Sequence, residues 1–306
     1  MEAAQIMTTT VSEVTLPVPW GHISGKVWGS LSAPPVLCVH GIQDNANTFD
    51  NLIPLMPSSF CYVAIDLPGH GRSSHFPSGF VFSNIDYVMS VRRIVDHFEW
   101  KRFIYMGHSL GGQIGFFFSG FYPEHVSKLI VLDSVLPYRD PRLNLSECVT
   151  KFYDNLFILE KKMASQEPPS YSEGEALRRL TDGRPSTLTR EAAMLLFSRG
   201  VTKVGEGYAF SADQRLKYRA LTYLSKEETL GIISRIRCPV FLIRASETED
   251  AGSYYVNGDF EKLLQATLGA QYHYKVVRGS HDVHLNNPED FAEELSNFVI
   301  KQQSSL

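Results

Sequence analysis

The sequence lacks the run of about 20 apolar residues that a membrane-spanning helix needs. The opening residues, with the acidic Glu2 among them, contain no apolar stretch, so we expect no secretory signal peptide. Cysteine is scarce and forms no CxxC pair, which argues against a disulfide framework or a zinc site. We expect four reduced, structural cysteines, which are Cys38, Cys61, Cys148 and Cys238.

Positive charge is not in excess either, because 29 Lys and Arg residues stand against 33 Asp and Glu residues, giving a net charge of −4. Nucleic acids and anionic membranes require clustered positive charge, so we expect neither as a partner. We expect a cytoplasmic protein, and the sequence indicates no particular oligomeric state. The last four residues, 303–306, read QSSL, which is similar to the peroxisomal Ser-Lys-Leu signal but lacks its central basic residue. A peroxisomal location is therefore the alternative.

Short apolar runs alternate with helical patterns along most of the chain. This alternation is typical of a mostly parallel sheet with helices on both faces. The first two runs are separated by Pro19-Trp20-Gly21 and are expected to pair antiparallel at the sheet edge. We predict eight strands, at residues 11–18, 23–28, 36–39, 62–65, 103–106, 129–132, 240–243 and 274–277.

The alternation stops after Leu132, and the sequence becomes helical and polar until about Leu224. The only strand pattern in this stretch is 208–210. We therefore predict an α/β core of residues 1–135 and 225–306, interrupted by a helical cap of residues 136–224. A closing helix is expected at 288–301, with Pro288 in its first turn, where the missing N–H costs nothing.

The strongest motif is Gly107-His108-Ser109-Leu110-Gly111, directly after the predicted strand 103–106 and directly before a predicted helix. A serine in a tight strand-to-helix turn presents its hydroxyl at the carboxyl edge of the sheet, where ligands bind in open α/β folds. The helix start offers backbone N–H groups to a developing negative charge. Ser109 is therefore the candidate nucleophile, and its neighbour His108 is a candidate substrate-binding residue.

A serine needs a base, and His281 is the candidate because it follows the last predicted strand and precedes the closing helix. The order of serine first and histidine last is that of the α/β-hydrolases. His284 is the rival base, although it is closer to the helix. In the early Val39-His40-Gly41-Ile42 turn, the N–H of Ile42 can face Ser109 and form an oxyanion hole with the N–H of Leu110.

Several motifs together resemble the α/β-hydrolase superfamily, in the order seen in its epoxide-hydrolase, haloalkane-dehalogenase and esterase branch. The segments Pro17 to His22 and Gln43 to Asn45 more narrowly resemble the animal serine hydrolase-like proteins. The resemblance covers both ends of the core but not the cap. It rests on Val39-His40-Gly41, on Asp66 to Ser74, on Gly107 to Gly112, and on His281 with Asn287-Pro288.

One position departs from the common pattern of this superfamily. The resemblance expects the acid of the catalytic triad after the strand 240–243, but Thr248 stands at that position. A second arrangement, found in dehalogenase-like relatives, places the acid after the strand that follows the nucleophile helix, and there this chain has Asp133. Asp133 is the candidate acid, and the alternatives are Glu247, Glu249, Asp250 or no working acid.

These residues predict a serine hydrolase that cleaves an ester-type bond of a small apolar substrate through an acyl-enzyme, with no cofactor and no metal. Epoxide hydrolysis and dehalogenation are disfavoured because the resemblance implies an aspartate nucleophile for them, whereas this chain has Ser109. Thioesters, lactones and carbon–carbon bonds remain open as substrates. The alternative function is a small-molecule binding protein that keeps the fold with little or no turnover.

Overall fold

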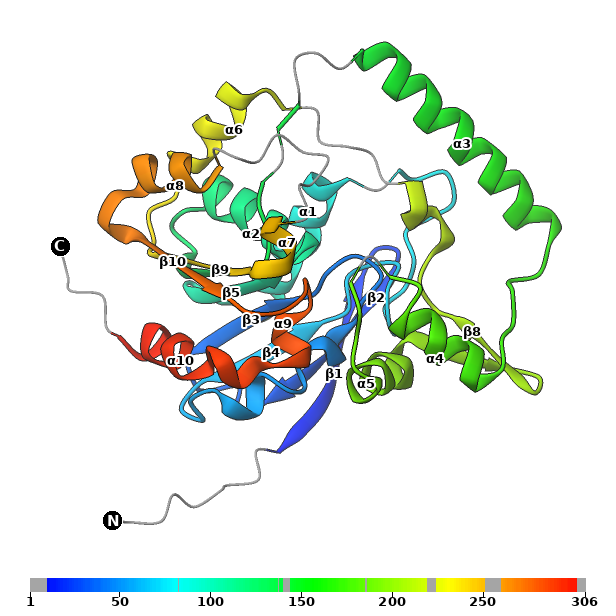
Figure 1. Cartoon of the computed structure of the whole chain (residues 1–306), viewed down its shortest axis with the longest axis horizontal. Helices are drawn as coiled ribbons and strands as arrows, with labels where there is room; N and C mark the ends of the chain where they lie inside the picture. Colours follow the sequence, from blue (N-terminus) through cyan, green and yellow to red (C-terminus); the bar gives the residue numbers. More distant parts are fainter. Residues whose placement is uncertain are drawn as a thin grey trace.

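A single large sheet sets the position of the functional side chains (Figure 1). The structure is a computed structural model that describes residues 10–81, 83–136, 138–139, 144–184, 186–218, 224–250 and 260–301. Residues 303–306, which are similar to the peroxisomal signal, lie outside these described residues. The sheet contains all eight predicted strands, which are β1 (Val11–Val18), β2 (Gly21–Trp28), β3 (Pro35–Val39), β4 (Cys61–Ile65), β5 (Phe103–His108), β6 (Val126–Leu132), β9 (Val240–Ala245) and β10 (Tyr272–Val277).

The strand order is β1-β2-β4-β3-β5-β6-β9-β10. β1 pairs antiparallel with β2, and β2 pairs antiparallel with β4, whereas the remaining neighbours are parallel. The predicted antiparallel pair at the sheet edge and the mostly parallel sheet are therefore confirmed. Because the parallel strands run in one direction, the loops after β3, β5, β6 and β10 meet at one edge of the sheet.

Both faces of the sheet are buried, which explains why its central strands are continuous apolar runs. Along β3, Leu37 and Val39 pack into one apolar cluster, and Val36 and Cys38 pack into the cluster on the opposite face. This alternation follows the two-residue period of a strand. The first face is covered by α1 (Asn84–His97), α2 (Leu110–Phe121), α6 (Lys226–Ile233) and α8 (Phe260–Leu268), and the second by α10 (Ala292–Ile300).

The segment of residues 136–224, called the insertion below, lies between β6 and α6, and none of its described residues joins the large sheet (Figure 1). The predicted strand at 208–210 is present as part of β8, but a partner strand that the sequence pattern did not indicate pairs with it. No helix in the described part of the chain combines the length and apolarity that a bilayer crossing requires. The elements of the insertion are α3 (Leu145–Ser165), α4 (Glu173–Thr181), α5 (Arg190–Gly200), β7 (Val201–Val204), β8 (Gly207–Phe210) and η3 (Gln214–Tyr218).

The closing helix begins later than predicted. Residues Pro288–Asp290 form a short 3-10 turn, and the α-helix α10 starts only at Ala292. Between them Phe291 has φ −143° and ψ −5°, which is not a helical conformation, and its side chain is buried in the cluster under α10. Burial of this aromatic ring fixes the break that the apolar pattern alone did not reveal.

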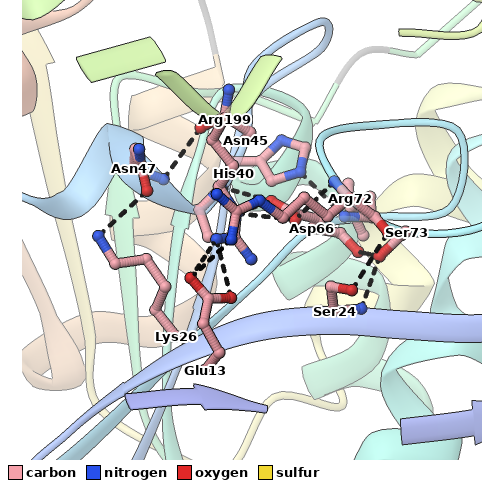
Figure 2. Close-up of polar contacts among 12 residues, drawn as sticks. Glu13, Ser24, Lys26, His40, Asn45, Asn47, Asp66, Arg72, Ser73 and Arg199 are labelled. Atoms are coloured by element: carbon pink, nitrogen blue, oxygen red, sulfur yellow. Dashed lines mark hydrogen bonds and ion pairs between the residues drawn. The ribbon is translucent and has the colours of Figure 1, made fainter. Parts of the chain in front are cut away.

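A buried ion pair fastens α5 of the insertion to the sheet (Figure 2). Arg199 Nε lies 2.8 Å from Asp66 Oδ2, and its Nη1 lies 2.8 Å from Glu13 Oε1 on β1. The side chains of Arg199 and Asp66 are 1% and 0% exposed. Nearby, the Asn45 and Asn47 side-chain amides donate to the carbonyls of Leu196 and Leu195. These contacts join β1, the loop after β3, the loop after β4 and α5.

We expect Arg199→Ala to lower the free energy of unfolding by about 3 kcal/mol, because it leaves the Asp66 carboxylate buried without its counter-ion. The N–H groups of Ala46 and Arg72 still donate hydrogen bonds to this carboxylate. We therefore expect a loss near the lower end of the range of about 3 to 5 kcal/mol for breaking a buried ion pair. Urea unfolding followed by circular dichroism measures the change. The matched control is Arg190→Ala, an exposed arginine of the same helix, for which we expect a change within about 0.5 kcal/mol. Equal stability of the two variants would refute the role of the ion pair.

Candidate active site

Ser109 occupies a sharp turn between β5 and α2, with φ 49° and ψ −114°. A non-glycine residue adopts positive φ only at a cost in strain, so the surrounding contacts must hold this conformation. The turn leaves no room for side chains on either side. A Cβ at Gly111 would lie 2.0 Å from the carbonyl oxygen of Val39, and one at Gly107 would lie 2.3 Å from the carbonyl oxygen of Gly111. The glycines of the motif therefore allow the close approach that places Ser109 at the sheet edge.

The structure brings Asp133 and His281 together, although 148 positions separate them in the chain. His281 Nδ1 lies 2.5 Å from Asp133 Oδ2. Asp133 follows β6 directly, and its other oxygen, Oδ1, accepts a hydrogen bond from the N–H of Ala245 at 2.9 Å. Its carboxylate is thus fixed from two sides and can hold the imidazole of His281 in one orientation.

The environment of Asp133 and His281 favours the charged forms of both side chains. Burial alone would lower the pKa of His281, but the hydrogen bond that its Nδ1–H donates to Asp133 and the negative charges of Asp133, Asp282 and Asp44 raise it above its ordinary value. Burial would raise the pKa of Asp133, but the hydrogen bond and charge of His281, the charge of Arg244 and the N–H of Ala245 lower it. An imidazole that can accept a proton beside a fixed carboxylate is what general-base catalysis requires.

Of the residues that the sequence left open as alternative acids or as a rival base, those whose side chains are described do not take part in the contact between Asp133 and His281. Glu247 lies in α7 (Ser246–Asp250), where its side chain is exposed, and its backbone N–H bonds the carbonyl of Gly279. The side chains of Glu249 and Asp250 lie outside the described part of the structure. The rival base His284 is fully buried on α9 (Val283–Asn286), and its Nε2 lies 2.8 Å from Thr48 Oγ1. Burial lowers its pKa well below the ordinary value.

A cavity of about 770 Å³ lies between the sheet edge and the insertion, and Ser109 and His281 both line it. In the described residues no hydrogen bond joins the Ser109 hydroxyl to the imidazole of His281. The cavity volume is within the range typical of small-molecule sites. Its apolar lining comes from Ile42 and from six residues of the insertion, namely Pro168, Pro169, Tyr171, Leu180, Phe210 and Ala212.

The two amides predicted for the oxyanion hole belong to segments that meet at this cavity. Ile42 lines it from the loop after β3, and Leu110 is the first residue of α2, directly after Ser109. No backbone hydrogen bond from either amide is found among the described loops and turns. His108 also lines the cavity, but its ring is buried, and its Nε2 donates to the carbonyl of His281 at 3.1 Å. In this position His108 supports the His281 loop, and its contact with substrate stays a prediction.

An ion-pair cluster that the sequence did not predict lies beside these residues. Arg184 of the insertion places Nη1 2.6 Å from Asp44 Oδ1 and Nη2 3.1 Å from Asp282 Oδ1. Ligand atoms of Asp44, Asp282 and His108 lie within 4.8 Å of one another, a spacing at which three groups can contact one metal ion. Because the guanidinium of Arg184 already supplies the positive charge for both carboxylates, we interpret this cluster as an ion-pair site. Asp44 appeared in a motif, but no local pattern pointed to Arg184.

Comparisons with known proteins identify the family to which this fold belongs. A family model described as alpha/beta hydrolase fold matches residues 34–288. The chain therefore belongs to the α/β-hydrolase family. It is 38% identical to human Serine hydrolase-like protein 2, with 94% of each chain covered, and 34% identical to a zebrafish Serine hydrolase-like protein, covering 99% of this chain and 94% of that one. These similarities confirm the resemblance to the animal serine hydrolase-like proteins.

A solved structure extends the agreement to three dimensions. The crystal structure of a hypothetical protein from Pseudomonas aeruginosa is similar with a TM-score of 0.79 and 26% sequence identity. The similarity covers 93% of this chain and 96% of the bacterial chain. The two proteins thus share one fold over most of their length.

Proposed function

We propose that this protein is a serine hydrolase that cleaves ester-type bonds through an acyl-enzyme intermediate. The observation that carries the proposal is the 2.5 Å contact between His281 Nδ1 and Asp133 Oδ2, because His281 lines the same cavity as Ser109. A strained serine and an imidazole at one cavity, with a buried carboxylate bonded to the imidazole, are the parts of a nucleophilic triad. Membership of the hydrolase family supports the same assignment.

The reaction follows from these positions. The hydroxyl of Ser109 attacks the substrate carbonyl and gives its proton to His281 Nε2, while Asp133 stabilises the resulting imidazolium. The N–H groups of Ile42 and Leu110 bind the oxyanion of the tetrahedral intermediate. Its collapse breaks the ester bond, and His281 returns the proton to the departing alcohol. A water molecule, activated in turn by His281, then releases the acid and regenerates Ser109.

The lining of the cavity supports an apolar substrate group. The insertion supplies the apolar residues Tyr171, Leu180 and Phe210, which would contact the acyl or alcohol portion away from the reacting carbonyl. We infer that the insertion acts as a cap over the site, since it supplies most of the apolar residues that line the cavity together with Ser109. Esters and thioesters both present the carbonyl that this arrangement would attack.

Reaction with a fluorophosphonate probe tests the proposal, because an activated serine displaces the fluoride and keeps the phosphonyl group. We expect one covalent adduct, mapped to Ser109 by peptide mass spectrometry, with slow or no reaction after heat denaturation. p-Nitrophenyl esters of rising acyl length should be hydrolysed with a clear optimum. A folded protein that remains unlabelled and hydrolyses none of the esters would favour the alternative, a binding protein without turnover.

A further inference from the structure

One side chain of the insertion joins the two loops that carry the proposed machinery. Arg184 contacts Asp44, which is two residues after Ile42, and Asp282, which follows His281 directly. The side chain of Arg184 is 17% exposed, whereas those of Asp44 and Asp282 are 1% and 0% exposed. Asp282 also accepts a hydrogen bond from the hydroxyl of Ser186, which lies two residues after Arg184 in the insertion. The position of the oxyanion loop relative to the base loop therefore depends on the insertion.

The same contacts set the charge balance around His281. Two buried carboxylates without a counter-ion would act strongly on a nearby imidazole, because charges are poorly screened in the interior. The guanidinium between Asp44 and Asp282 offsets this negative charge, and it also holds the pKa of Asp44 well below its ordinary value despite burial. The titratable and charged groups that face His281 are Asp133 with Arg244 behind it, Asp282 on its own loop, Asp44 with Arg184, His108 from β5 and His284 from α9.

We propose that Arg184 is a positioning residue of this hydrolase: it fixes the oxyanion loop and the His281 loop relative to each other and compensates the carboxylates beside His281. This inference rests on the proposed function. It makes the insertion part of the catalytic apparatus rather than only a cover over the cavity. A guanidinium suits the position because its planar fork can contact two carboxylates at once, whereas a lysine ammonium is a single point of charge.

The test is the pH dependence of kcat/KM for a p-nitrophenyl ester in Arg184→Gln. Only the neutral imidazole of His281 can act as base, so the rate falls as pH drops through its pKa. Loss of Arg184 leaves Asp44 and Asp282 free to stabilise the imidazolium, which raises the pKa of His281. We expect the acid limb to move up by about half to one pH unit. We also expect the plateau rate to fall about tenfold, because the oxyanion loop is no longer fixed.

Two further variants separate this role from a structural one. Arg184→Lys keeps the charge but loses the double contact, so its acid limb should stay near the wild-type position while the plateau rate falls. Arg184→Gln combined with Asp282→Asn removes one positive and one negative charge and should return the limb towards the wild-type pH. The matched control is Arg178→Gln, an arginine of α4 that is 72% exposed and pairs with Glu175, and it should change neither quantity.

The outcomes are distinguishable. An acid limb that does not move in Arg184→Gln would overturn the compensation of charge by Arg184, even if the rate falls. An unchanged plateau rate, or equal changes in Arg178→Gln, would overturn the fixing of the two loops by Arg184. If Arg184→Gln does not fold, an unchanged plateau in Arg184→Lys would overturn it. A wild-type protein that neither reacts with the fluorophosphonate probe nor hydrolyses esters would instead refute the proposed function on which the inference rests.

Discussion

Ser109→Ala is expected to lower ester hydrolysis by a factor on the order of 10⁴ to 10⁶ and to abolish fluorophosphonate labelling. The substitution removes the nucleophile, and any remaining rate would come from binding and from the two amides of the oxyanion hole. The methyl group of alanine fits the space of the serine side chain, so we expect the fold and the cavity to remain. Initial rates with the best p-nitrophenyl ester, together with gel-based labelling, measure both effects.

Ser119→Ala is the matched control for this substitution. Ser119 lies on α2, the helix that Ser109 precedes, but it is fully buried and does not line the cavity. We expect the control to keep its labelling and turnover. Hydrolysis by Ser109→Ala at more than about a tenth of the wild-type rate would exclude Ser109 as the nucleophile, given the size of the effect that loss of a triad serine has.

The second large effect is expected for Asp133→Asn, which should lower kcat by about 10⁴-fold. The amide of asparagine donates a hydrogen to His281 Nδ1 where the carboxylate accepted one. The imidazole then carries its hydrogen on Nε2 and can no longer take the proton of Ser109. The side-chain oxygen can still accept the N–H of Ala245, so we expect little change in the overall fold. Turnover and thermal unfolding of the same preparation separate these two effects.

Glu247→Gln provides the comparison for the acid, since Glu247 is exposed on α7. We expect it to retain nearly the full wild-type rate. Near-normal turnover in Asp133→Asn, with a large loss in Glu247→Gln, would move the role of the acid to α7. This pair of variants therefore tests Asp133 against Glu247, one of the alternative acids that the sequence left open.

Most of the sheet could be predicted because each central strand is buried on both faces and so appears as an uninterrupted apolar run. β7 (Val201–Val204) could not be found in this way, since three of its four residues are exposed. It is held by pairing with β8, which in turn bridges Tyr171. The start of α10 was placed too early because the apolar period continues through Phe291, whereas the backbone there is not helical.

Residues of the candidate site could be predicted where local contacts or the order of the strands fix them, but not where the path of the insertion does. The turn at Ser109 could be predicted because its glycines are required by contacts within a few residues and with the neighbouring strand. Asp133 and His281 could be proposed from the fold, because β6 and β10 flank β9 and their loops leave the same sheet edge. The link from Arg184 to Asp44 spans 140 positions and depends on the path of the insertion, which no periodic pattern encodes.

The ion pair between Arg199 and Asp66 links the unfolding of α5 to that of the sheet. Lifting α5 from the sheet would separate the buried Asp66 carboxylate from its counter-ion Arg199 and would also break the asparagine contacts to Leu195 and Leu196. Opening at this end of the insertion therefore carries the cost of a broken buried ion pair. We expect α5 and the sheet to unfold as one cooperative unit.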